Sequence, residues 1–592
     1  MNEHNTSGVG KKRAPLYEAL LAYRDSKQRS FHVPGHKNGQ VYHQWMNQSE
    51  GTEDALQKGI VDHTETGDIL GREQRRQEEN VKEGEQTVFS ADYSLKDTDQ
   101  SRHVVPVRAY LDMMEMDVTE ITGTDDLHHP EGVIKEAQDL ASDCFGAEES
   151  FFLVGGSTAG NLSLLLTICD EPGSIVLVQR NVHKSVIHGL MLAGARAVFL
   201  EPWVDPESGL AVMPSIETVQ AAVQMYPEAK GVFVTLPNYY GMGADLTPIA
   251  EVCHEAGMPL LVDEAHGAHY GQHPELPVSA LSCGADGVVQ STHKMLAAFT
   301  MGAMLHIQGP RLNRSLLRQR LAMVQSSSPS YPVMASLDLS RRLLHVHGAD
   351  AFTAGLAAVK ALKRGLAELP RFQLLQPADS LQQEPAYGNE NPAAMPGRQG
   401  YTAQDPFKVV IYDDTGILSG YELQQQLEAC GCVPEMSDER YVVLLFSLGS
   451  TLQDAEHVLQ ALRHINVSYK LQHSLESTAS VRTASQTQTD PPIYVSTWNN
   501  IEDRERLSEP VAFSLQPIIE RDTIGVPIED CAGYRSAEMV IPYPPGIPLV
   551  YPGERISSKI AERIRILRDG GAKFQGISDH MYQKIKVMKP ES

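Results

Sequence analysis

The chain has no run of apolar residues near the roughly 20 that a membrane-spanning helix requires. Its first residues, Met1 to Lys12, are polar and contain no apolar segment of the kind found in signal peptides. No CxxC pair is present, and the seven cysteines are odd in number and widely spread, which indicates reduced thiols rather than a disulfide framework. We therefore expect a soluble cytoplasmic protein.

Basic residues are scarce relative to acidic ones. Lys and Arg number 50 and Asp and Glu 75, giving a net charge of −25 at pH 7. Such a chain repels nucleic-acid phosphates and anionic lipids, so we expect neither nucleic acid nor membrane as a partner. The charge suits a cationic small molecule, although acidity that serves only solubility is the commoner explanation.

Short apolar runs alternate with helical segments after about Asp117. The runs span 151–154, 174–178, 197–200, 231–236, 259–263 and 287–291. Continuous apolar strands separated by helices are typical of a parallel sheet covered on both faces. Helical sequence follows Gly309 to about Leu369, and apolar runs at 407–413 and 441–449 then indicate a smaller α/β segment. The sequence thus predicts an α/β fold with a large and a small domain.

The first candidate site segment is GGSTAGN (155–161), which follows the strand at 151–154 and leads into a helix. Gly156 allows the backbone to approach a ligand closely, and Ser157 and Thr158 offer hydroxyls beside the free N–H groups of a helix start. Such a start favours anions. Taken alone, an ordinary strand-to-helix turn explains the pattern more often.

The second segment is DEAHGAH (263–269), in which Asp263 ends a predicted buried strand. A carboxylate at this position needs a cationic partner, and a protonated pyridine nitrogen would serve. The letters DEAH also name a helicase box, but the chain contains no GxxxxGK[ST] phosphate loop. The sequence therefore excludes the helicase interpretation.

The third segment, STHKML, places Lys294 directly after an apolar strand, which is the next predicted strand after the one that ends at Asp263. Partial desolvation makes a lysine nucleophilic toward an aldehyde. A lone lysine after a strand is most often a solvated surface residue. Here an anion-binding loop, an acid for a ring nitrogen and an imine-forming lysine occur in order, and these are the parts of a pyridoxal phosphate (PLP) site.

A histidine follows another strand in the segment RNVHKS (180–185). His183 is placed to reach the same sheet edge and to stack on a planar cofactor, although a capping or core histidine is an equally good explanation of the pattern alone. Its spacing from His188 does not suit one helical face, so we expect no metal site.

Together these segments resemble the Orn/Lys/Arg decarboxylases, PLP enzymes of fold type I with the aspartate-aminotransferase architecture. The resemblance extends over most of the chain, in a short form without an N-terminal wing. Its motifs also include HVPGHKNG (32–39), DVTEITGTDDLHHP (117–130), LPNYYGMGADL (236–246), STHKMLAAFTMGAMLH (291–306), SSSPSYPVMASLD (326–338) and PYPPGIPLVYPGE (542–554). It implies a mostly parallel large domain and a smaller C-terminal α/β domain.

The resemblance also implies roles for individual residues. Lys294 would hold PLP as a Schiff base, Asp263 would pair with the pyridinium nitrogen, and His183 would stack on the ring. The remaining cofactor-binding residues that it implies are Gly156, Ser157, Thr158, Ala265, His266, Ser291, His293 and Ser327. Ser327 matches a hydroxyl presented to the neighbouring subunit's phosphate, which implies a homodimer.

The implied reaction is decarboxylation of a basic amino acid to a polyamine precursor, with a proton returned to Cα by Lys294 or His183. Arginine is favoured, and lysine and ornithine stay possible. Asp126 and Glu538 are candidates for the acid that meets the substrate's cationic head group. Transamination, racemisation or elimination on the same fold, or a catalytically silent regulatory homologue, are the alternatives.

Domain boundaries complete the prediction. We expect an N-terminal arm (1–40), a flexible polar insertion (41–110), a PLP-binding large domain (111–325), connecting helices (326–370), a small α/β domain (371–473), a flexible linker (474–495) and a C-terminal decarboxylase domain (496–592).

Overall fold

The computed structural model describes residues 10–25, 108–377, 401–476, 506–543, 548–569 and 573–589. The chain forms two compact units, one of Met1–Ala22 with Glu120–Ser592 and one of Tyr23–Thr119. The described part of the second unit consists mainly of α3 (Arg108–Met114). Almost all of the predicted polar insertion lies outside the described residues.

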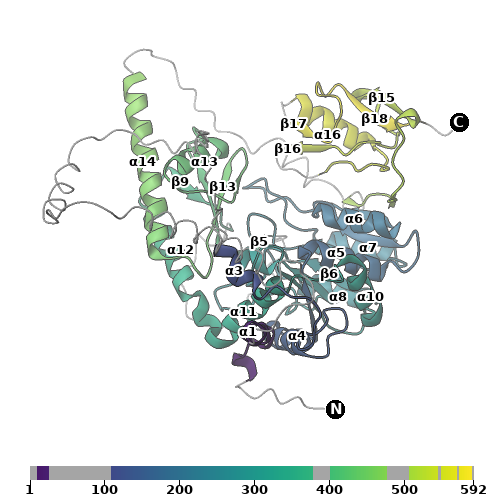
Figure 1. Cartoon of the computed structure of the whole chain (residues 1–592). Coiled ribbons are helices and arrows are strands. Elements are labelled where there is room, and N and C mark those ends of the chain that lie inside the picture. Colours follow the sequence, from purple (N-terminus) through teal and green to yellow (C-terminus); the bar gives the residue numbers. More distant parts are fainter. Residues whose placement is uncertain are drawn as a thin grey trace, which may run out of the picture. The chain divides into compact units, whose positions relative to one another are not determined.

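The first unit, which makes up most of the ribbon in Figure 1, is built on an eight-stranded sheet with the order β1-β8-β7-β6-β4-β2-β3-β14. Its strands are β1 (Glu149–Leu153), β2 (Ile175–Gln179), β3 (Arg196–Leu200), β4 (Val232–Thr235), β6 (Leu260–Asp263), β7 (Gly287–Gln290), β8 (Ala303–Ile307) and β14 (Val511–Ala512). Strands β3, β2, β4, β6 and β7 are parallel, whereas β8 runs antiparallel to β1 and β7, and β14 antiparallel to β3.

The central strands are apolar except at their last residues because helices cover the sheet. Every residue of β2, β6 and β7 is buried. The surrounding helices include α4 (Val133–Phe145), α5 (Gly156–Ile168), α6 (Lys184–Ala193), α7 (Ile216–Met225), α8 (Thr247–Glu255) and α10 (Arg314–Val324). Helix α5 packs against α6 and α10, and α7 packs against α8. The prediction of a mostly parallel sheet is confirmed. Strand β8, most of which lies within the motif STHKMLAAFTMGAMLH (291–306), was not predicted as a separate strand.

A smaller antiparallel sheet follows the helices α11 (Tyr331–His347), η2 (Gly348–Phe352) and α12 (Thr353–Leu366). It has the order β12-β13-β11-β9, from β9 (Phe372–Leu374), β11 (Lys408–Asp413), β12 (Met436–Ser437) and β13 (Tyr441–Leu445), with α13 (Gly420–Ala429) and α14 (Leu452–Glu476). Helices α12 and α14 pack together. Helix α14 extends into the first residues of the predicted linker, the rest of which lies outside the described residues.

A short strand pair ties the segment before β11 to the large sheet's loops. Strand β5 (Met242–Gly243) pairs antiparallel with β10 (Ala403–Gln404). The backbone N–H of Asp405 also donates to the carbonyl of Gly241. These bonds fix where the first residues of β11 lie.

The C-terminal part contains the strand pairs β15 (Thr523–Pro527) with β18 (Lys584–Met588) and β16 (Ile541–Tyr543) with β17 (Lys573–Gln575), together with α16 (Ser558–Asp569). It has its own apolar core, which includes Ile528, Val540 and Ile564. A buried ion pair joins it to the large sheet, because Arg180 after β2 donates to both carboxylate oxygens of Glu554 at 3.1 and 2.7 Å.

Short elements complete the described chain: η1 (Gly10–Lys12), α1 (Pro15–Asp25), α9 (Thr292–Met295), η5 (Glu520–Asp522) and η6 (Ile528–Asp530). Helix α1 begins at Pro15, a residue favoured in the first turn of a helix. Within the described residues, no helix has the length and apolar character needed to cross a membrane.

Candidate active site

The predicted site residues gather where neighbouring strands of the large sheet end. Asp263 is the last residue of β6, Ser291 follows β7, and His183 lies in the loop after β2. Gly156 begins α5, just after β1. Because parallel strands present their carboxyl ends at one edge of a sheet, these residues occupy the edge where ligands bind in such folds.

Asp263 is a buried acid at this edge, with a relative exposure of 2%. Its Oδ2 accepts a hydrogen bond from the Asn161 side-chain amide at 2.8 Å, and its Oδ1 accepts from the backbone N–H of Ala265 at 3.1 Å. Burial raises the pKa of the Asp263 carboxyl, and the Asn161 bond opposes that rise. A buried carboxylate with only neutral donors in contact can pair with a cationic group on a ligand.

Lys294 lies in the short helix α9 and faces His266. Its Nζ is 3.0 Å from Nε2 of His266, and the Nζ of Lys408 is 3.0 Å from the other ring nitrogen, Nδ1. Burial lowers the pKa of Lys294, while Asp263 and Glu435 oppose that shift. The lowered pKa favours the free amine that an aldehyde requires.

His183 is the N-cap residue of α6, and its Nδ1 accepts from the backbone N–H of Ser185 at 3.2 Å. The Ser185 hydroxyl lies 2.8 Å from the same nitrogen and also accepts from Asn161 at 2.9 Å. The pKa of His183 is lowered, chiefly by burial and against the effect of Asp263. Asn161 and Ser185 thus link the histidine loop to the acid at the end of β6.

Hydroxyl and amide groups suited to a phosphate are also present at this edge. Ser157 and Thr158 lie in the first turn of α5, where N–H groups have no intrahelical acceptor. Ser291 is fully buried, yet its hydroxyl has no hydrogen-bond partner among the described residues. An unpaired buried hydroxyl is unfavourable. The phosphate of PLP would satisfy it, and the ring nitrogen would satisfy Asp263, so the residues present fit that cofactor.

Two of the predicted phosphate-loop groups are engaged within the protein. The backbone N–H of Gly156, which has φ +72°, donates to the carbonyl of Met301 at 3.0 Å. His293 Nδ1 lies 2.9 Å from the carbonyl of Gly302, which places a proton on that nitrogen. Ser327 is exposed in the segment between α10 and α11.

Three residues of this neighbourhood were not predicted from the sequence. The ring of Tyr239 lies 4.8 Å from that of His266 and 6.0 Å from Lys294 Nζ. Lys408 contacts His266 directly. Glu435 acts electrostatically on Lys294, Lys408 and Tyr239. Tyr239 lies in the motif LPNYYGMGADL (236–246). Lys408 begins β11 and Glu435 precedes β12 in the small sheet, and no sequence motif marks either residue.

The two acids predicted for the substrate head group both accept local hydrogen bonds. Glu538 accepts from the backbone N–H groups of Ser578 and Lys586, both at 2.9 Å, within the C-terminal part. Asp126 accepts from the backbone N–H of His128 at 2.8 Å. In the described part of the chain, no group of three or more His, Cys, Asp or Glu residues is arranged to hold a metal ion.

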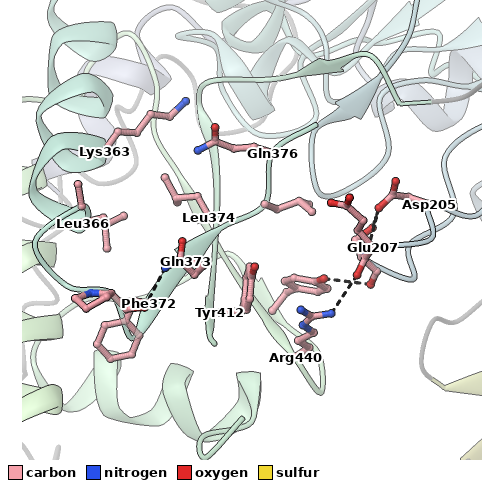
Figure 2. A pocket seen from close by; sticks show the side chains of 15 residues that line it. Asp205, Glu207, Lys363, Leu366, Phe372, Gln373, Leu374, Gln376, Tyr412 and Arg440 are labelled. Carbon is pink, nitrogen blue, oxygen red and sulfur yellow. Dashed lines mark hydrogen bonds between the residues drawn. The ribbon is translucent and has the colours of Figure 1, made fainter. Parts of the chain in front are cut away.

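Figure 2 shows a cavity of the protein, which has a volume of about 430 Å³. Lys363 and Leu366 line it from α12, and Arg440 lines it from the loop before β13, where its guanidinium donates to the carbonyl of Glu207 at 3.3 Å. None of the predicted cofactor-binding residues lines this cavity. It is therefore distinct from the candidate active site.

Comparison with known proteins gives matches over nearly the whole chain. A family model described as Orn/Lys/Arg decarboxylase, major domain, matches residues 110–454, and the corresponding C-terminal domain matches residues 507–583. The uncharacterized protein YaaO of Bacillus subtilis (strain 168) is 36% identical over 95% of this chain and 96% of its own length. The arginine decarboxylase of Bacillus anthracis is 32% identical over 80% of this chain and 89% of its own.

A solved structure shows the same fold. Lysine decarboxylase A from Pseudomonas aeruginosa superimposes with a TM-score of 0.67 at 20% identity, over 98% of this chain and 81% of that one.

Proposed function

Because the chain belongs to the Orn/Lys/Arg decarboxylase family and is a PLP-dependent decarboxylase of a basic amino acid, we propose that its substrate is arginine. Relatives named arginine decarboxylase are 31–32% identical and match 74–81% of the chain. Relatives named lysine decarboxylase are 23–26% identical. This difference in identity is the observation that carries the choice of arginine.

Glu435 is the acid that we assign to the substrate's guanidinium. It is exposed, it precedes β12, and its charge raises the pKa of both Lys294 and Lys408 against the effect of burial. A carboxylate can accept two parallel N–H bonds from a guanidinium, which an ammonium cannot donate in that geometry. Glu435 takes this role in place of Asp126 and Glu538, whose carboxylates are bonded locally.

The remaining residues divide the work of binding the cofactor. Lys294 would hold PLP through its ε-amine, Asp263 would keep the ring nitrogen protonated, and His183 would pack on the ring. Ser157, Thr158 and Ser291 would donate to the phosphate, with Gly156 and His293 shaping the loops around it, and Ala265 and His266 would lie under the ring. When bound, PLP accepts the electron pair that remains on Cα as carbon dioxide leaves.

A proton must then reach Cα. Lys294 and His183 are the two groups proposed to supply it, because both lie at the sheet edge beside Asp263 and influence each other's charge. Burial lowers the pKa of both groups, so each releases its proton more readily than a solvated histidine or lysine does.

We also propose that the enzyme is a cytoplasmic homodimer that supplies a polyamine precursor. All seven cysteines are free thiols, which suits a reducing compartment. Ser327 is exposed, and its hydroxyl must be exposed if it is to reach the phosphate of a neighbouring subunit.

The test is an assay of carbon dioxide release from arginine, lysine and ornithine by the purified full-length holoenzyme. We expect the highest kcat/KM with arginine, and a Glu435→Gln variant should raise KM for arginine by about tenfold or more. Borohydride reduction followed by peptide mapping should find a pyridoxyl group on Lys294. A higher kcat/KM with lysine or ornithine would refute the substrate assignment, and a label elsewhere would refute the cofactor assignment.

A further inference from the structure

His266 lies between two lysines, and this arrangement limits how protons can be distributed. Its Nε2 is 3.0 Å from Lys294 Nζ, and its Nδ1 is 3.0 Å from Lys408 Nζ. The histidine is 6% exposed, and burial together with the two lysines lowers its pKa well below the ordinary value, so the ring is neutral.

A neutral imidazole has one N–H and one lone pair. The lone pair can accept from one ammonium, but the ring N–H can donate only to a group that has a lone pair of its own. An ammonium has none. Since both ring nitrogens of His266 have a lysine nitrogen at hydrogen-bond distance, the lysine that faces the ring N–H must be a neutral amine, whereas the lysine that faces the ring lone pair can be an ammonium.

The surroundings indicate which lysine keeps the proton. Lys408 is 2% exposed and is fixed by its own backbone, because its N–H donates to the carbonyl of Asp405 and Gly241 leaves room for its Cβ. Burial lowers the pKa of Lys408, and the carboxylate of Asp405 is the largest influence that opposes this shift and favours the charged form. For Lys294 the carboxylate that most favours the charged form is Asp263, but the ring nitrogen of a bound cofactor would pair with Asp263 and weaken that effect.

We propose that Lys408, acting through His266, is a positioning residue that keeps Lys294 in its neutral amine form. The Lys408 ammonium donates to Nδ1, which places the ring proton on Nε2, and that N–H donates to the Lys294 amine. The inference rests on the proposed function, since it assigns a purpose to the amine only if Lys294 carries the cofactor.

Other charged or titratable groups act on this cluster and must be considered in any titration. Those that face Lys294, His266 or Lys408 are Asp263, His183, His293, Asp405, Glu435 and Tyr239. None of them lies between the two lysines as His266 does, so a Lys408 substitution changes one interaction while leaving these groups in place.

The test measures how the reactivity of Lys294 depends on pH. Full-length protein freed of cofactor is mixed with PLP at a series of pH values and reduced with borohydride, and the pyridoxyl label on Lys294 is quantified by peptide mapping. The variants are Lys408→Met, Lys408→Gln and Lys408→Arg. Lys363→Met is the matched control, because burial also lowers the pKa of Lys363 but this lysine lines the separate cavity.

We expect the pH midpoint for labelling to rise by about one unit in Lys408→Met and Lys408→Gln, because a nearby positive charge is lost. Lys408→Arg and Lys363→Met should retain the wild-type midpoint. Thermal unfolding establishes that each variant is folded, and Lys408→Gln, which still has a donor for His266 Nδ1, serves if Lys408→Met does not fold.

The outcomes separate the two proposals. If wild-type protein carries the label on Lys294 but folded Lys408→Gln shows the wild-type midpoint, the role of Lys408 is refuted and the proposed function stands. If wild-type protein carries no label on Lys294, the proposed function fails and this inference fails with it.

Discussion

Replacing Asn161 by leucine tests the network that holds Asp263 ready for the cofactor. The Asn161 amide donates to Asp263 Oδ2 at 2.8 Å and to the Ser185 hydroxyl at 2.9 Å, and Asn161 is fully buried. Leucine has a similar volume but no donor, so Asp263 keeps only the Ala265 N–H at 3.1 Å. The substitution therefore removes a stabilising bond to the ionised carboxylate without leaving a large cavity.

The magnitude follows from the charge on the acceptor. A hydrogen bond to a charged group contributes about 1.5–3 kcal/mol, which corresponds to a rise of about one to two units in the pKa of Asp263. The protonated acid cannot pair with a pyridinium nitrogen. We therefore expect PLP to bind about 10- to 100-fold more weakly near neutral pH, with the deficit shrinking as pH rises and Asp263 ionises.

The assay is a titration of full-length cofactor-free protein with PLP at several pH values, followed by absorbance. Ser185→Ala is the comparison variant, because it removes the other acceptor of the Asn161 amide and the hydroxyl beside His183 Nδ1 but leaves the bond to Asp263 intact, so any loss of PLP binding that it causes should lack the pH dependence expected from Asp263. A folded Asn161→Leu protein that binds PLP as tightly as wild type, with the same pH dependence, would show that Asp263 does not depend on this amide.

Three further substitutions probe packing and charge. Glu554→Ala leaves the buried Arg180 guanidinium with Glu201, 2.6 Å from its Nε, as its remaining acidic partner and should destabilise the protein by about 3 kcal/mol, seen as a lower Tm. Glu554→Ala combined with Arg180→Met should be milder. Burial raises the pKa of Glu264 to about 8, so between its ordinary value of 4.5 and about 8 the folded protein binds the extra proton. The protonated Glu264 side chain therefore contributes fully to the free energy of unfolding below pH 4.5, and this contribution is lost as pH rises to about 8. Glu264→Gln should flatten the fall of Tm with pH between these values. An unchanged slope of Tm against pH would contradict the raised pKa of Glu264. Gly160→Ala should cost about 1–3 kcal/mol, because a Cβ there would lie 2.8 Å from Val289 Cγ1, and an unaltered Tm would mean that α5 can move away from β7.

The large sheet was predictable because its signal is local. A strand covered on both faces must be apolar along its length, and the runs before Asp263 and Lys294 have that property. The carboxyl ends of such strands meet at one edge, so placing Asp263, Lys294 and His183 together required no knowledge of the loops. The direction of β8 was not predictable in this way, because an antiparallel strand between β1 and β7 has the same buried apolar pattern as its parallel neighbours.

The acid that we propose for the substrate's cationic head group could not be chosen from the sequence. The sequence does not show whether a carboxylate is free or accepts hydrogen bonds from nearby backbone N–H groups. Glu538 precedes a conspicuous Pro/Gly-rich motif, yet both of its oxygens accept backbone N–H groups in the C-terminal part. Glu435 has no flanking motif, and only the packing of the small sheet reveals that its charge acts on Lys294. Such pairings between distant segments depend on tertiary structure.

The reactivity of Lys294 is therefore set by residues of two sheets. Asp263 belongs to the large sheet, whereas Lys408 begins β11 in the small one, and the β5–β10 pair holds the two parts in register. Gly241 shows how closely they approach, because a Cβ at that position, where φ is +79°, would lie 2.5 Å from the Cβ of Lys408. In the sequence this glycine reads only as a turn residue. In the structure it lets a second lysine reach His266, so a loop outside the segments that carry Asp263, His183 and Lys294 helps to determine the charge of the Lys294 amine.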